Sequence, residues 1–410
     1  MKLAKHILLL WIVSFSSKAQ VKILFDATKA QTAGNADWVI DADVNDLYWN
    51  PSACVGCGNE SDPQKIPTPA QSGITASTPE TYWTGSLSNW GIDCVKRGYT
   101  VETLPHNGQI TYGSLSNAQD LSHYKVFIID EPNILFTSAE KTAIMNFVKN
   151  GGGLFMISDH DVSDRNGDGY DSPTIWNDLI QNNSVQNNAF GFSFNLDNFS
   201  QTSNNVLASA SDSILHGPMG NVTQVKWSNG TSMTLNTSQN PTVKGVVFQT
   251  GASTAGSNSV MCAYSRWYAG KVGAISDSSP PDDGTGDPND VLYNGYTLDA
   301  SGNHQRLIMN MTIWLALGGT TASGIEEIAS DNNMMIYPNP SNTQFTLSFA
   351  RSLSNASIEV RSANGSLVAS EEHFNGQTFT LNTSEYSNGI YFVRVNSGTS
   401  SSVAKMVVIH

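Results

Sequence analysis

Residues 151–173, GGGLFMISDHDVSDRNGDGYDSP, place a short apolar run directly before a loop crowded with aspartates. The run from Leu154 to Ile157 follows three glycines, and an apolar run of this length bounded by glycine predicts a buried strand. In open α/β sheets, ligands bind at the carboxyl ends of the strands. Carboxylates crowded together there raise one another's pKa or bind a cation. We therefore expect a metal-assisted or acid/base site at the end of this strand.

The segments on either side predict a mostly parallel sheet. Val21 to Phe25 and Tyr124 to Ile129 are apolar strands, and a helix follows the second strand from Thr137 or Ser138. Strand, helix, glycine turn and strand form a βαβ unit, which requires parallel strands. Residues 184–265 change to short alternating strands, GKVGAI at 270–275 is a further strand, and 304–317 is an apolar closing helix. We expect one α/β domain over residues 20–317, with a β-rich insertion.

Polar side chains follow several of these strands. The catalytic candidates are Ser158, Asp159 and His160 after one strand, and Asp277 and Ser278 after another. Asp26, Asp130-Glu131 and Asp282-Asp283 lie at comparable positions. A divalent ion there would activate water, or two carboxyl groups would share acid and base roles. The alternative is a serine nucleophile, Ser158 or Ser278, with His160 or His304 as its base, although the chain has no GxSxG elbow.

The second half of the acidic loop has calcium-ligand spacing. Asp164, Asn166 and Asp168, followed by Gly169, match the opening of a calcium loop in which alternating oxygens point inward. The twelfth position, where an EF-hand has glutamate, is Ile175, so Asp171 would close the site instead. Asp26 is a further candidate ligand. The alternative is an Asp/Gly turn in solvent.

Composition limits the function classes. The 410 residues carry 21 Lys and Arg against 35 Asp and Glu, a net charge of −14, which argues against nucleic acid as a partner. Residues 1–19 have the charged start, apolar run and small-residue cleavage site of a signal peptide. No later run reaches the roughly 18 apolar residues that span a bilayer, so we expect no transmembrane segment in the mature chain. In an exported protein we expect a Cys54–Cys57 disulfide, with Cys94 and Cys262 as buried thiols or a second bridge.

Residues 334–410 form a second domain after a polar linker at 318–333. Short strands separated by Asn-Gly turns predict an all-β sandwich. The motifs YPNPS at Tyr337, GIYFVRV at Gly389 and KMVV at Lys405 resemble the type IX secretion C-terminal sorting domain. That resemblance implies the type IX machinery as a partner, with the protein secreted or attached to the cell surface through the outer membrane.

Residues 20–317 resemble the class I glutamine amidotransferase-like superfamily. The resemblance rests on the βαβ-GGG arrangement, the GKVGAISDSS strand and the apolar closing helix, and it implies a flavodoxin-like fold. The superfamily's amidotransferases carry a nucleophilic cysteine after a strand, whereas this strand continues into Ser158-Asp159-His160. Glutamine chemistry is therefore not expected.

Together these features favour a secreted hydrolase acting on an extracellular polymer, a polysaccharide or an ester-containing substrate. The export signals indicate the substrate class, and the acidic strand ends indicate hydrolysis. Calcium or another divalent cation is the expected cofactor. The alternative is a non-catalytic, calcium-stabilised surface protein that binds glycans or protein partners.

Overall fold

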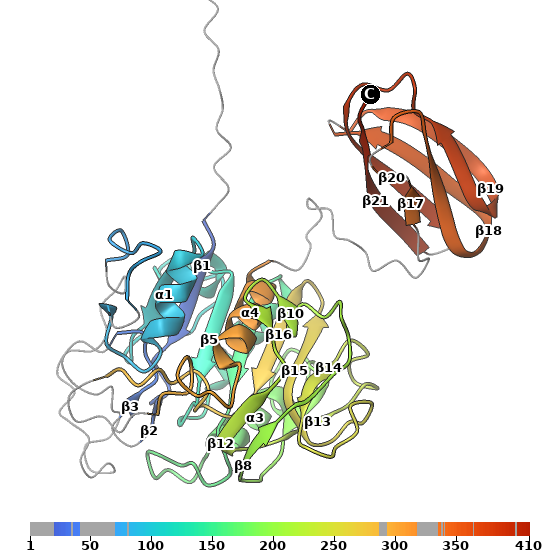
Figure 1. The fold of residues 1–410 in the computed structure, drawn as a ribbon. Helices are drawn as coiled ribbons and strands as arrows, with labels where there is room; N and C mark the ends of the chain where they lie inside the picture. Colours follow the sequence, from blue (N-terminus) through green and yellow to red (C-terminus); the bar gives the residue numbers. More distant parts are fainter. Residues whose placement is uncertain are drawn as a thin grey trace, which may run out of the picture. The chain divides into compact units, whose positions relative to one another are not determined.

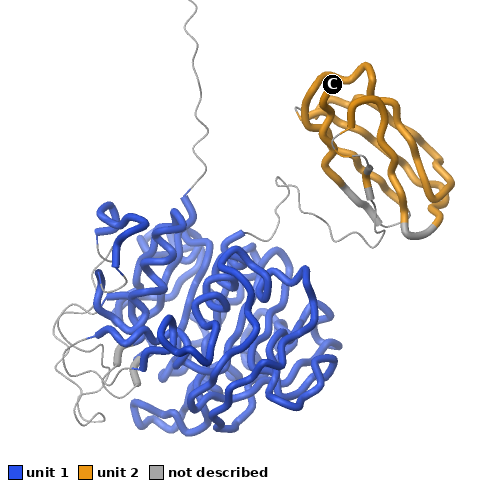
Figure 2. The backbone as a smooth tube through the Cα atoms, viewed as in Figure 1, with its two compact units in different colours: residues 1–321 blue, residues 322–410 orange. Residues whose placement is uncertain are grey.

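The chain forms two compact units, residues 1–321 and 322–410 (Figure 2). The computed structural model describes residues 20–33, 36–41, 70–79, 82–286, 293–317, 335–337, 339, 341–363, 365–397 and 400–410. The predicted signal peptide, the Cys54–Cys57 disulfide and the linker 318–333 lie outside these residues. Each unit is described separately below.

The first unit is built on a ten-stranded mixed sheet (Figure 1). Five parallel strands lie in the order β4 (Thr100–Leu104), β1 (Lys22–Asp26), β5 (Val126–Asp130), β6 (Gly153–Ile157) and β16 (Gly270–Ile275). The strand order reverses between β1 and β5, because the chain goes from β1 outward to β4 and then returns to the other side of β1. Such a reversal opens a crevice at the carboxyl ends of the strands.

The strands beyond β16 run antiparallel, as expected for residues 184–265. They are β15 (Val260–Trp267), β13 (Met233–Leu235) and β7 (Phe192–Phe194), with β14 (Lys244–Phe248) and β9 (Asn205–Val206) joined to β15. Three small two-stranded sheets surround this sheet: β8 (Phe199–Ser203) with β12 (Val225–Gly230), β10 (His216–Gly217) with β11 (Gly220–Asn221), and β2 (Thr32–Ala33) with β3 (Ala36–Asp37).

Helices cover both faces of the sheet. Helices α1 (Ser88–Lys96) and α4 (His304–Ala316) share one buried cluster with alternate residues of the strands, whereas α2 (Ser138–Lys149) and α3 (Ser172–Gln181) share the other. The sheet therefore has the two buried faces that parallel strands need. A short 3₁₀ helix, η2 (Leu121–His123), precedes β5. The expected helix start at Thr137 is present as a capping box, in which Thr137 and Glu140 exchange hydrogen bonds.

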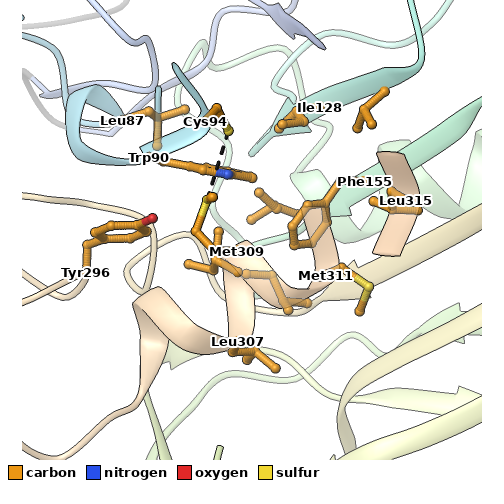
Figure 3. Close-up of a cluster of buried hydrophobic side chains, with 14 of the residues drawn as sticks. Leu87, Trp90, Cys94, Ile128, Phe155, Tyr296, Leu307, Met309, Met311 and Leu315 are labelled. Carbon is orange, nitrogen blue, oxygen red and sulfur yellow. Dashed lines mark hydrogen bonds between the residues drawn. The ribbon is translucent and has the colours of Figure 1, made fainter. Parts of the chain in front are cut away.

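The α1/α4 face is packed around Trp90, which is fully buried (Figure 3). Its ring meets Phe25 and Phe155 edge-on, with centroids 5.2 and 5.3 Å away. Its Nε1–H donates to Thr312 across 3.0 Å, which satisfies the buried indole. Two glycines of the sheet allow α4 this close: a Cβ at Gly153 would lie 2.8 Å from a Leu315 carbon, and one at Gly273 would lie 2.4 Å from the Met311 sulfur.

The second unit is a five-stranded antiparallel sheet. Its strands are β17 (Met335–Tyr337), β18 (Gln344–Ser362), β19 (Leu367–Asn382), β20 (Gly389–Ser397) and β21 (Ser400–Val408), with β18 and β20 at its centre. Alternate side chains form its core, including Phe345, Leu347, Val393 and Val395. This alternation is the period of two that the sequence pattern predicts.

Candidate functional site

The parallel strands bring acidic residues to one edge of the first unit's sheet. Asp130 is the last residue of β5 and pairs with Ile157, the last residue of β6. Asp159 comes two residues after β6, and Asp277 comes two residues after β16. All three side chains are buried, with 1%, 2% and 0% of their surface exposed. Buried carboxyl groups are costly unless they are paired or protonated, so their partners decide what this edge can do.

A pocket of about 210 Å³ opens beside these strand ends. Of the predicted catalytic residues, Asp159, His160 and Ser278 line it. The remaining lining residues come mostly from loops beyond the strand ends, and they are Trp38, Arg165, Ser228, Asn229, Ser279, Asp282 and Tyr293. The pocket walls are therefore mainly polar, with two aromatic side chains among them.

Glu131 is a carboxylate at this edge that accepts three side-chain hydrogen bonds. It is completely buried and accepts from Trp38 Nε1 at 2.9 Å, from Arg165 Nε at 2.8 Å and from Ser278 Oγ at 2.7 Å. Its backbone has φ of +35°, which is uncommon for a residue other than glycine. Such backbone strain persists only where the surroundings impose it. The three donors hold Glu131 directly behind the pocket.

Arg165 joins two of the carboxylates. Its Nε donates to Glu131, and its Nη2 donates to Asp159 Oδ2 across 2.7 Å. The backbone N–H of Arg165 donates to Asn133 Oδ1, which fixes the loop onto the end of β5. Arg165 was not among the predicted site residues. Its signal in the sequence is modest: it is the one basic residue inside the loop DHDVSDRNGDGYD.

Burial and mutual repulsion raise the pKa values of the carboxyl groups around the pocket. Burial raises the pKa of Asp277 to about 7, and the nearby Glu131 charge adds to the shift. Burial also raises the pKa of Asp282 to about 7, although Gly284 and Tyr293 donate backbone N–H groups to it. The pKa of Asp159 lies well above its ordinary value because of burial and the charges of Glu131 and Asp277, which outweigh Arg165. These carboxyl groups therefore lose their protons at a higher pH than ordinary carboxyl groups do.

Asp130 differs from its neighbours because neither of its carboxyl oxygens has a hydrogen-bond partner among the described residues. Burial and the charges of Glu131, Asp277 and Asp282 raise its pKa well above the ordinary value. A buried carboxyl group with two unsatisfied oxygens is rare in folded proteins. Packing alone does not explain why both oxygens of this buried carboxyl group lack a partner.

His160 lies on the pocket wall with its ring held at one nitrogen. Its Nδ1 is 2.5 Å from the carbonyl oxygen of Asp161, so this nitrogen carries the proton and donates. The other nitrogen, Nε2, lies 3.7 Å from Asp159 Oδ2. Ser158, in contrast, is fully buried, donates to the Asp159 carbonyl and does not line the pocket. His304, the other predicted base, is also buried and bonds the Gly295 carbonyl through Nδ1.

Asp26 faces its own loop and does not line the pocket. Its carboxylate accepts from the backbone and hydroxyl of Thr28 and from the side chain of Gln31. Burial raises its pKa to about 6 against the lowering effect of Lys29. Asp26 and Asp159 are therefore at the same sheet edge but in different surroundings.

The predicted calcium ligands form hydrogen bonds inside their loop. Asp164 accepts from the backbone N–H groups of Gly167, Asp168 and Gly169. Asn166 and Asp168 bond each other through Nδ2 and Oδ2 at 3.1 Å. Asp171 caps α3 by accepting from Thr174 N and also accepts from Val162 N. Across the described residues, no three His, Cys, Asp or Glu side chains converge as a metal site. The calcium site stays a prediction.

Cys94 and Cys262 are buried free thiols, so the bridge suggested as one alternative does not form between them. Cys94 lies in α1 with its sulfur 4.0 Å from that of Met309 (Figure 3), and Cys262 lies in β15. Burial raises the pKa of both thiols, which keeps them protonated. Neither lines the pocket.

Solved structures resemble the chain only distantly. The N-terminal domain of mmIFT52 is 15% identical, covers 61% of this chain and 98% of its own, and gives a TM-score of 0.40. A cytoplasmic protein from Salmonella typhimurium is 12% identical over 55% of this chain and 86% of its own, with a TM-score of 0.32. An immunoglobulin-like β-sandwich protein of the DUF3244 family from Bacteroides vulgatus is 12% identical over 20% of this chain and 90% of its own, with a TM-score of 0.16. No curated protein matches the chain.

The second unit has a clear family match. Residues 335–409 match the secretion system C-terminal sorting domain, which confirms the prediction drawn from the YPNPS, GIYFVRV and KMVV motifs. Among the described helices, none combines the length and apolarity needed to cross a membrane. The chain therefore carries a type IX secretion sorting domain at residues 335–409, and the protein is exported by that system, to be released or attached at the cell surface.

Proposed function

We propose that the first unit is a hydrolase of an extracellular polymer, and that the pocket at the carboxyl edge of its parallel sheet is the active site. The proposal is carried by one observation: the His160 ring and the Asp282 carboxyl group line the same pocket. Hydrolysis needs one group to accept a proton from water and another to give one to the leaving oxygen. The export route favours a polysaccharide or ester-containing polymer as substrate.

His160 is suited to the base role because its Nδ1 is occupied. With Nδ1 donating to the Asp161 carbonyl, the unprotonated nitrogen is Nε2. In the proposed reaction, Nε2 takes a proton from water as the water oxygen bonds to the carbon under attack. The Asp159 carboxyl group lies beside this nitrogen, with Oδ2 at 3.7 Å from Nε2.

Asp282 is suited to the acid role because its pKa, raised by burial to about 7, lets it carry a proton at a much higher pH than an ordinary carboxyl group. As the carbon–oxygen bond to the leaving group breaks, Asp282 gives its proton to the leaving oxygen. An acid whose pKa lies near the working pH gives up a proton most effectively, which suits Asp282 to this role. Arg165 is a positioning residue, since it holds Asp159 and Glu131 in place.

We also infer that the parallel part of the sheet is flavodoxin-like. Numbered along the chain, its five parallel strands lie in the order 2-1-3-4-5, which is the flavodoxin-like order. This supports a distant relation to the class I glutamine amidotransferase-like superfamily. Since the described cysteines are buried away from the pocket, the relation extends to the fold and the place of the site, and the chemistry is different.

The experiment compares two adjacent aspartates. Asp282 and Asp283 are each 2% exposed, have pKa values raised to about 7 and accept backbone N–H groups, but only Asp282 lines the pocket. On a panel of polysaccharides and polyesters, we expect Asp282→Asn and His160→Ala to lower kcat about 10²–10⁴-fold. Asp283→Asn should leave kcat within about threefold of the unmodified chain, with melting temperatures measured in parallel.

Equal losses in Asp282→Asn and Asp283→Asn would reject the acid role of Asp282. A chain that binds polymers but cleaves none of them would reject hydrolysis and support the alternative, a binding protein at the cell surface.

A further inference from the structure

We infer that the pocket selects a sugar unit bearing a protonated amine. This inference rests on the proposed function, because it names the substrate class of the same site. It starts from the charge of the residues around the pocket. Arg165 is the one lysine or arginine among the described residues that line the pocket, and it is already shared between Glu131 and Asp159. In the described part of the chain, Asp130, Asp277 and Asp282 have no lysine or arginine as a counter-charge.

Asp130 is one of the buried carboxyl groups without a counter-charge. It is 1% exposed, its two oxygens have no hydrogen-bond partner among the described residues, and the charges of Asp277 and Asp282 act on it. Asp130 and Ile128 belong to the same strand two residues apart, so both side chains are on the α1/α4 face. Unsatisfied buried carboxyl oxygens behind a pocket make its interior attractive to a donor with positive charge.

The nearby lysines already have partners and do not supply that charge. Lys226 Nζ lies 5.6 Å from the Tyr293 ring centroid, but it pairs with Asp299 at 3.0 Å. Lys29 acts on Asp26, but it pairs with Glu140 at 2.7 Å. Within the described residues, the carboxyl groups of the pocket therefore keep an excess of negative charge whenever they ionise.

The chemistry of the pocket favours an organic ammonium over a metal ion. A metal needs several ligands at fixed distances, and no such set converges within the described chain. An ammonium group needs only acceptors at ordinary hydrogen-bond distance, and carboxylates are the strongest of these. Trp38 also lines the pocket, and an aromatic ring attracts a cation. The volume of about 210 Å³ is of the order needed for one sugar ring.

Crowding among the carboxyl groups also favours a bound ammonium group. Burial raises the pKa values of Asp130, Asp277 and Asp282, and the Glu131 charge adds to the shifts of Asp130 and Asp277. A bound ammonium offsets both effects, since it brings an opposite charge into contact with the carboxylates. A uronic acid or sulfated unit adds a further negative charge and is disfavoured.

The test uses the full chain and four tetrasaccharides of defined charge: glucosamine, N-acetylglucosamine, glucose and galacturonic acid. We expect the glucosamine tetramer to bind at least tenfold more tightly than the N-acetylated and glucose tetramers in calorimetry, and the galacturonate tetramer to bind most weakly. The preference should fall below threefold in Asp282→Asn and persist in Asp283→Asn, the adjacent aspartate that does not line the pocket. Melting temperatures show whether both variants fold.

The outcomes separate the two proposals. If a neutral or acidic tetramer binds as tightly as the glucosamine tetramer, the amine preference is wrong, and the hydrolase proposal stands when that tetramer is cleaved. If the glucosamine tetramer is preferred but no tetramer is cleaved, the hydrolase proposal fails and the amine preference holds. If none of the four binds, both proposals are rejected.

Discussion

Arg165 reaches back six residues to donate to Asp159 while its Nε donates to Glu131 at the end of a different strand. The two carboxylates are almost fully buried, with side-chain exposures of 3% and 0%, whereas the Arg165 side chain is 30% exposed. One surface arginine thus supplies the positive charge for two buried carboxylates. We therefore expect Arg165 to contribute to the stability of the first unit.

Replacing Arg165 with Met should destabilise the first unit by about 2–3 kcal/mol. Removing one member of a buried pair typically costs 3–5 kcal/mol because a charge is left buried without a partner, and the partial exposure of Arg165 reduces that cost. Arg361→Met is the matched control, because the Arg361–Glu359 pair is exposed at 45% and 29% and such pairs contribute about 0–1 kcal/mol. Urea unfolding measures both variants, and equal small losses would contradict the role given to Arg165.

Stability should fall as pH rises from about 4 to about 7. Asp277, Asp282 and Asp283 have pKa values of about 7 in the fold, against an ordinary value of 3.8. Between these two values the folded chain holds protons that the unfolded chain has released, so the stability they contribute is complete below about pH 4 and is lost through pH 7. The unfolding equilibrium constant should change about tenfold per pH unit for each group.

The sign is the opposite of that for Asp212, whose pKa is lowered by its hydrogen bond with Lys244 and whose contribution is lost only below its ordinary pKa. Chemical denaturation at pH 5, 6, 7 and 8 checks the direction. Asp283→Asn should reduce the slope of unfolding free energy against pH by the contribution of one proton. Asp212→Asn should leave that slope unchanged between pH 5 and pH 8. A chain that gains stability from pH 5 to pH 8 would contradict this account.

Much of the parallel sheet and its acidic edge follows from local sequence patterns. The run Leu154 to Ile157 follows three glycines and is buried on both faces, so a short apolar segment was enough to predict β6. The Thr137–Glu140 capping box is likewise complete within four residues. Asp159 and His160 come shortly after β6 in the chain. Their position at the sheet edge could therefore be predicted from the direction of the strand alone.

The rest of the pocket depends on contacts between distant segments. Trp38 bonds Glu131 across 93 positions, and Ser278 bonds the same carboxylate across 147. No local periodicity encodes such contacts, because they arise from how the loops fold over the sheet edge. The same loops give Asp164 and Asp171 backbone partners that the ligand spacing did not indicate.

The Trp90 hydrogen bond should be measurable against another buried tryptophan. Trp90→Phe removes ring volume and also the bond from Nε1 to Thr312, whereas the Nε1 of Trp267 has no partner among the described residues. We expect Trp90→Phe to cost about 1 kcal/mol more than Trp267→Phe, the net value of one hydrogen bond. Trp90→Ala should cost about 3–5 kcal/mol. Equal costs for the two Phe variants in urea unfolding would contradict the hydrogen-bond argument.

Asp164 should stabilise its loop even when calcium is chelated. Its carboxylate accepts from three backbone N–H groups, two of them at 2.8 Å. Asp164→Ala should therefore cost about 1 kcal/mol in chelator, as for the loss of a helix-capping side chain. Asp168→Ala should cost less, because Asp168 accepts a single backbone N–H, from Tyr170.

A calcium contribution would be separate from this cost and would depend on concentration. Calcium bound only by the folded chain stabilises it by RT ln(1 + [Ca²⁺]/Kd), about 2.7 kcal/mol at a hundred times Kd. The predicted site requires that calcium raise the melting temperature of the unmodified chain and that Asp164→Ala abolish the rise. If the unmodified chain melts at the same temperature in calcium and in chelator, the hydrogen bonds of Asp164 account for the loop without an ion.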